Sequence, residues 1–151
     1  MFIDALQKVA AALAITATGV SDSIDLGAAP IPRQIGDGEP VGFGFAIGVD
    51  ADHTTGDETY TFEVIESAAA ALTSPNVIAS RSFTAAQAVA GALVAGTRFF
   101  IGIPQGTPNL RYIGVRATLG GTTPTITYSA WLSPRSMFSQ EPHSYPKGFT
   151  A

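Results

Sequence analysis

The chain has 151 residues and no cysteine, which fits one domain with a buried core and excludes a disulfide framework, a thiolate metal site and a cysteine nucleophile. A net charge of −4 argues against binding duplex DNA or an anionic membrane through bulk charge. Charged residues make up 13% of the chain, about half the usual fraction, which leaves two interpretations open: an Ala- and Gly-rich domain with few long side chains, or a surface largely covered by other subunits.

The amino-terminal part of the chain is weakly patterned. Residues 1–13 place apolar side chains at helical spacing, so they suit either a short amphipathic helix or an extended arm. Residues 14–19 and 23–27 are predicted as short strands or as one bent strand. Two prolines and two glycines in residues 28–39 predict a long loop.

Residues 41–49 form a strongly patterned strand. Val, Phe, Phe, Ile and Val share one face, which predicts a core-facing side, while Gly, Gly, Ala and Gly share the other. A second backbone or sheet could approach that smooth face closely. Residues 50–58 are predicted as a polar loop and residues 59–65 as the next strand, with its aromatic and aliphatic side chains inward.

The middle of the chain continues the strand pattern. Residues 77–83 and 97–103 are predicted as strands. Between them, residues 84–87 match a capping box, which predicts one or two helical turns. The apolar stretch 84–103 is interrupted by polar residues and glycines, so no segment meets the roughly 20 apolar residues that a membrane span requires.

The clearest pattern lies in residues 109–132. Two runs of alternating apolar and polar residues flank Gly120 and Gly121, which predicts an antiparallel hairpin with a tight reversal. The alternation disappears after Ser133, where prolines and aromatic residues predict an extended tail. The chain as a whole is therefore expected to be an all-β sandwich or barrel of about eight strands. We divide it into an arm or short helix (1–13), a β domain (14–133) and a tail (134–151).

Candidate chemical groups are few. His53 and His143 are interpreted as surface residues, since neither lies in a recognisable nucleophile motif. The loop at 50–58 carries close carboxylates, which are a possible Ca²⁺ site, but Thr55 and Thr61 stand where an EF-hand needs glycine and glutamate. We therefore interpret it as a solvated loop. No metal, cofactor or catalytic residue is predicted, and a hydrolase ranks last among the functions considered.

Several short motifs follow one another in a fixed order: ITATGVSDSIDLG (15–27), IGDGEPVGFGFAIGVD (35–50), SPNVIASRSF (74–83), AGTRFFIGIP (95–104) and NLRYIGVRATLGG (109–121). Their order and spacing resemble the capsid cement, or decoration, proteins of tailed bacteriophages. The resemblance covers about residues 14–132 and rests mainly on the IDLG run, the GEP before the glycine-alternating strand, and the L-R-Y strand with its glycine turn.

The resemblance implies a jelly-roll fold with extended terminal arms and no catalytic residue or cofactor. It also implies a place on the outer surface of the phage capsid, as a homo-oligomer (dimer or trimer) bound to the major capsid protein, with no direct contact to nucleic acid or membrane. We expect the contacts with that partner to come from the arms, the 28–39 loop and the tail. The candidate contact residues are Phe2, Arg33, Arg135, Phe138 and Tyr145.

The alternative function is a carbohydrate-binding β-sandwich module of a virion or secreted protein. Its candidate sugar platforms are Trp131, Tyr112 and Tyr128. The alternation places Tyr128 on the opposite face of its strand from Trp131, and isolated aromatic residues on a sheet more often serve packing. Trp131 is therefore interpreted first as a packing residue.

Overall fold

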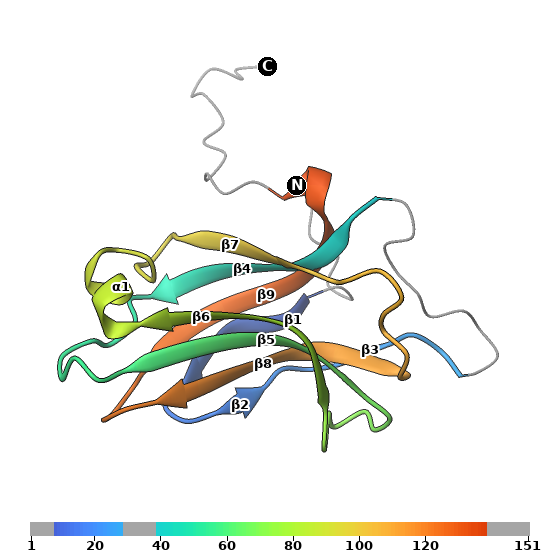
Figure 1. Ribbon diagram of the computed structural model, residues 1–151, viewed down its shortest axis with the longest axis horizontal. Helices are drawn as coiled ribbons and strands as arrows, with labels where there is room; N and C mark the ends of the chain where they lie inside the picture. Colours follow the sequence, from blue (N-terminus) through green and yellow to red (C-terminus); the bar gives the residue numbers. More distant parts are fainter. Residues whose placement is uncertain (1–7, 29–38, 139–151) are drawn as a thin grey trace, which may run out of the picture.

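Two antiparallel β-sheets pack face to face in the computed structural model, which describes residues 8–28 and 39–138 (Figure 1). Sheet A has the strand order β1-β9-β4-β7, and sheet B has the order β2-β8-β5-β6 with β3 also paired to β8. The strands are β1 (Lys8–Ile15), β2 (Gly19–Val20), β3 (Ile24–Asp25), β4 (Val41–Val49), β5 (Thr59–Ser67), β6 (Asn76–Thr84), β7 (Arg98–Gly102), β8 (Tyr112–Gly120) and β9 (Ile126–Pro134).

The strand pairing is nested from the chain ends inward. β1 pairs with β9, β2 and β3 pair with β8, β4 pairs with β7, and β5 pairs with β6, all antiparallel. One long hairpin wound over itself in this way gives two facing layers, of four and five strands, which is the jelly roll. The expected all-β sandwich is confirmed, and its winding is that of a jelly roll.

The predicted hairpin over residues 109–132 is wrong. β8 pairs with β5 in sheet B, whereas β9 pairs with β1 and β4 in sheet A, so the two strands face each other across the core. Alternation shows that one face of a strand is buried, but it does not identify the neighbouring strand. The chain still needs glycine where it passes from β8 in sheet B to β9 in sheet A. Gly121 has a φ of 92°, and a Cβ there would lie 2.5 Å from the carbonyl oxygen of Asp57.

Aromatic side chains from both sheets fill the core. Phe45 of sheet A stacks on Phe99 with ring centroids 4.9 Å apart and meets Phe62 of sheet B edge-on at 5.3 Å. Phe62 also contacts Tyr128 at 5.5 Å. All four rings are almost completely buried, and full burial of such a side chain stabilises the fold by roughly 1.5–3 kcal/mol. The bulky face of residues 41–49 is therefore the core face, as predicted.

Both ends of the β domain differ from the sequence-based boundaries. Residues 8–13, left open as helix or arm, lie in the edge strand β1, which buries Val9 and Ala10. The pairing of β1 with β9 shifts register twice, and Ala12, within the second shift, has a φ of 51°. Such bulges change the side-chain period, which explains why the apolar residues resembled helical spacing.

The carboxy-terminal strand also runs further than expected. β9 continues through Pro134, which pairs with Val41, and is followed by a 3-10 turn, η2 (Arg135–Met137). The helix α1 (Ala85–Val89) confirms the predicted capping box. Thr84 Oγ1 accepts a hydrogen bond from the backbone N–H of Gln87, and Gln87 Oε1 accepts one from the backbone N–H of Thr84. No helix in residues 8–28 and 39–138 is long and apolar enough to cross a membrane.

Candidate functional site

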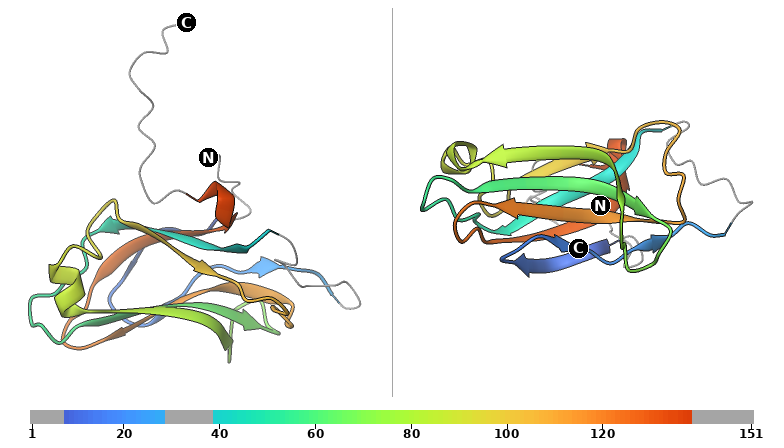
Figure 2. Two further views of the ribbon diagram at one scale, coloured as in Figure 1. Left: turned by 45° about the horizontal axis from the view of Figure 1, so that its top comes forward. Right: turned by 60° about the horizontal axis from the view of Figure 1, so that its bottom comes forward.

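The predicted contact residues divide into two groups. Phe2, Arg33 and Tyr145 lie outside the described residues. Arg135 belongs to η2 and Phe138 follows it directly. Figure 2 (left) shows η2 on the outer side of sheet A, away from sheet B. The structure therefore brings two of the five predicted residues together on one face of the sandwich.

Strand register places three described chain ends at one end of sheet A. Lys8, the first residue of β1, lies opposite Trp131, and Val41, the first residue of β4, lies opposite Pro134 at the end of β9. The nested winding causes this, because it lays the first and last strands side by side.

An aromatic cluster covers the outer face of sheet A. Phe138 packs against Phe100 of β7 and Trp131 of β9, with ring centroids 5.4 and 6.3 Å away. Gly44 of β4 lies between Phe100 and Trp131 in register, and a Cβ on Gly44 would lie 2.9 Å from the rings of both Phe138 and Trp131. The smooth face predicted for residues 41–49 thus accommodates an aromatic ring here, instead of a second backbone or sheet.

Polar contacts fix the turn that carries this cluster. The backbone N–H of Arg135 donates to the carbonyl of Pro40 at 2.7 Å, and the N–H of Phe138 donates to the carbonyl of Arg135 at 3.2 Å. The Ser136 hydroxyl donates to the carboxylate of Glu39. The Arg135 guanidinium lies 5.1 Å from the centre of the Phe100 ring and 5.9 Å from that of Phe138, within cation–π range.

The three candidate sugar platforms do not form an open aromatic surface. Trp131 is only 4% exposed, and its buried Nε1–H has no hydrogen-bond partner among the described residues. Tyr128 lies in the core, its hydroxyl likewise has no partner within residues 8–28 and 39–138, and burial raises its pKa to about 12. Tyr112 is half-buried, with the Arg111 guanidinium 5.1 Å above its ring. The interpretation of Trp131 as a packing residue is confirmed.

The carboxylates of the 50–58 loop hold the loop itself together. Asp57 accepts hydrogen bonds from the Thr122 N–H at 3.0 Å and from the Thr55 hydroxyl at 2.7 Å, and these bonds lower its pKa. Glu58 is buried and accepts from the Thr55 hydroxyl and from the N–H groups of Thr55 and Gly56, which also lower its pKa. Within the described ranges, no group of three or more His, Cys, Asp or Glu side chains is placed to hold a metal ion.

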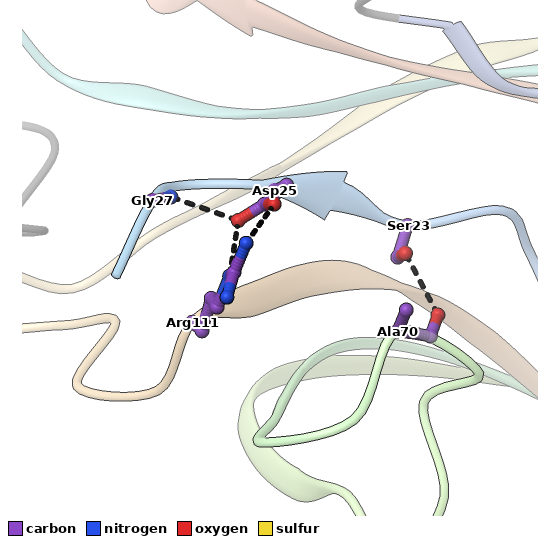
Figure 3. A network of polar contacts seen from close by, with 5 residues as sticks. All are labelled: Ser23, Asp25, Gly27, Ala70 and Arg111. Atoms are coloured by element: carbon purple, nitrogen blue, oxygen red, sulfur yellow. Dashed lines mark hydrogen bonds and ion pairs between the residues drawn. The ribbon is translucent and has the colours of Figure 1, made fainter. Parts of the chain in front are cut away.

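Two arginines of sheet B form ion pairs with carboxylates of the same sheet. Arg111 donates to both carboxylate oxygens of Asp25, from Nε to Oδ1 at 2.8 Å and from Nη2 to Oδ2 at 2.7 Å (Figure 3). Arg116 Nε donates to Glu63 at 2.6 Å. Burial raises the pKa of Glu63, but the hydrogen bonds from Arg116 and Thr118 outweigh burial, so the net shift is downward. Both arginines therefore form local salt bridges within sheet B.

Sequence reasoning missed Phe100 as a member of the aromatic cluster. The pair Phe99-Phe100 lies in a strand, so one ring must point inward and the other outward. Phe99 is buried in the core, and Phe100 faces the outside of sheet A. An outward-facing phenylalanine beside glycine-rich neighbours was the available signal for a covered or contacting surface.

Comparison with known proteins adds a family. A family model described as Bbp16 matches residues 9–131, from the second residue of β1 to Trp131 in β9. The match suggests a phage-related family. No curated protein matches the chain. The matched range contains Gly44, Phe100 and Trp131 of the aromatic cluster, whereas η2 and Phe138 follow it.

Proposed function

The chain belongs to the Bbp16 family, and we propose that it is a capsid cement, or decoration, protein of a tailed phage. In this proposal it attaches to the outer surface of the head as a dimer or trimer and stabilises contacts between major capsid protein subunits. Support comes from the phage-related family match, from the ordered motifs that resemble cement proteins, and from the jelly-roll winding of the domain.

The observation that carries the proposal is the fixed aromatic and cationic turn on the outside of sheet A. Arg135 and Phe138 were predicted as partner contacts, and both lie on that face, held by ring contacts and by hydrogen bonds to the start of β4. Arginine and aromatic side chains on a rigid scaffold are the residue types that most often dominate protein interfaces. The turn therefore offers a preorganised contact on the outer face of sheet A.

The mechanism is one of repeated binding. Each copy contributes a modest interface, and an oligomer that bridges two shell subunits converts its second contact into an intramolecular one. The rigid sandwich fixes the distance between contacts, so that separating two shell subunits requires the loss of several contacts at once. On this account the protein changes the stability of the head without a chemical step.

The test uses phage heads that lack this protein and the purified full chain. We expect the chain to co-sediment with the heads at saturable occupancy and to raise the temperature at which the heads disrupt. Arg135→Ala should weaken attachment. Arg81→Ala is the matched control, because Arg81 also lies over phenylalanine rings, at 4.9 and 5.4 Å, but on sheet B. Heads that neither bind the wild-type chain nor gain stability from it would contradict the proposal.

A further inference from the structure

The two sheets differ in the sign of their charged side chains. The strands of sheet A and the turn η2 carry three cations, Lys8, Arg98 and Arg135, and no aspartate or glutamate. The strands of sheet B carry both signs, with acidic residues on β3 and β5 and arginines on β6 and β8. A chain with a net charge of −4 thus has one sheet from which acids are missing.

Register places the three cations on the outer face of sheet A. Lys8 lies opposite Trp131, and Arg98 lies opposite Ala46, two residues from Phe100 along β7. The Arg135 guanidinium lies over the Phe100 ring. With strands about 4.8 Å apart and about 3.4 Å per residue, the backbone positions of Lys8 and Arg98 are separated by roughly 14 Å across the sheet and roughly 7 Å along it, and Arg135 follows the end of β9. We call this patch, with the aromatic cluster inside it, the cationic face.

The cations of this face lack the carboxylate partners that two arginines of sheet B have. Both ion pairs found among the described residues, Arg111 with Asp25 and Arg116 with Glu63, belong to sheet B. Lys8 and Arg135 are exposed and Arg98 is half-buried. The described carboxylate beside the turn, Glu39, accepts the Ser136 hydroxyl. The cationic face therefore offers donors and positive charge that its own sheet does not neutralise.

The chemistry of the face specifies its partner. Between the cations lies the aromatic cluster, whose rings cover Gly44 of β4. We propose that the cationic face docks on an acidic protein surface whose carboxylates pair with Lys8, Arg98 and Arg135. The inference rests on the proposed function, in which that surface belongs to the shell protein. Sheet B, whose ion pairs are internal, then faces away from the shell.

The first test measures this chemistry without phage heads. Fluorescence anisotropy of a labelled polyglutamate peptide reports its binding to the full chain at low and high salt. We expect Lys8→Gln and Arg98→Gln each to weaken binding about two- to five-fold and the double variant about four- to twenty-five-fold, the range typical of exposed ion pairs. Added salt should weaken wild-type binding as the charges become screened.

The matched control is Arg81→Gln, which removes the same charge from the exposed edge strand β6 of sheet B. We expect it to bind polyglutamate as the wild type does, with native tryptophan emission in all variants showing that each is folded. Equal losses in Arg81→Gln and Arg98→Gln would overturn the inference, since bulk charge would then explain both. Tighter binding of a single-stranded DNA oligonucleotide than of polyglutamate would overturn it too, in favour of nucleic acid.

The second test repeats the series on heads that lack the protein. Attachment of the wild type with loss in the double variant supports both proposals. Equal attachment of the wild type and the double variant overturns the cationic-face inference while leaving the proposed function in place. Failure of the wild type to attach overturns the proposed function, and the polyglutamate series then decides the docking chemistry by itself.

Discussion

Replacing Phe138 with alanine should uncover the single tryptophan of the chain. The Phe138 ring packs on Trp131 and Phe100 and lies over Gly44, and Trp131 is only 4% exposed in its presence. Full burial of a phenylalanine contributes roughly 1.5–3 kcal/mol, so this half-buried ring contributes about 1 kcal/mol. One aromatic contact adds about 0.5–1.5 kcal/mol.

We therefore expect Phe138→Ala to lower the free energy of unfolding by about 2 kcal/mol, which for a domain of this size lowers Tm by roughly 4–8 °C. Urea unfolding followed by tryptophan emission measures both effects in one experiment. The native emission maximum should move to longer wavelength, because water reaches the indole. Met137→Ala is the control: its side chain is 56% exposed, so neither the emission nor the midpoint should change.

A native emission maximum identical in the wild type and in Phe138→Ala would refute the reasoning, since Trp131 would then owe its burial to other residues. An unchanged unfolding midpoint with a shifted emission would instead show that Phe138 covers Trp131 without stabilising the sandwich. The two readouts thus separate the position of the ring from its energetic contribution.

Two further predictions concern the same strands. Gly44→Ala places a Cβ 2.9 Å from the rings of Phe138 and Trp131, so it should lower the free energy of unfolding by about 1–3 kcal/mol and shift the tryptophan emission. In Gly48→Ala the new Cβ lies 3.5 Å from its nearest atom, so thermal unfolding and tryptophan emission should both match the wild type. The Tyr128 pKa of about 12 exceeds the unfolded value of about 10, so the unfolded state loses its proton first and the free energy of unfolding falls by about 1.4 kcal/mol per unit between pH 10 and 12. Tyr128→Phe should reduce this loss of stability at high pH without destabilising the protein at pH 7, because the deleted hydroxyl has no hydrogen-bond partner among the described residues. Urea unfolding midpoints at pH 7, 9 and 11 test this.

Local pattern was sufficient to predict the longer strands from β4 onward and their buried faces, but not β1. The strand predicted over residues 41–49 coincides with β4, and its bulky side chains Phe43, Phe45 and Ile47 are in the core. Period-two alternation carries this information because each strand has one face toward the same core. The same reasoning gave the capping box at Thr84, where the interaction spans three residues and depends on no distant part of the chain.

Pairing and site formation could not be predicted in this way. β8 and β9 look like a hairpin in sequence because both alternate and glycines separate them, yet each strand finds its neighbours far along the chain. The aromatic cluster has the same origin: Phe138 meets Phe100 and Gly44, residues about 40 and 90 positions away, only through the nested winding. Residue types therefore predicted Arg135 and Phe138 as contact residues, but not the surface on which they lie.

The nested winding also explains how one face of the protein comes to differ from the other. It joins β1, with Lys8, to β9, with Trp131, and it sets β7, with Arg98, at the opposite edge of the same sheet. Most of the described acidic residues, in contrast, lie in sheet B and in the 50–58 loop, where several bind arginines or backbone N–H groups. Of the four described lysine or arginine side chains without an ion pair, three lie on one aromatic face, which under the proposed docking orients the protein toward an acidic surface. That asymmetry favours the second interpretation of its composition, a surface partly covered by another subunit, over a generally uncharged one.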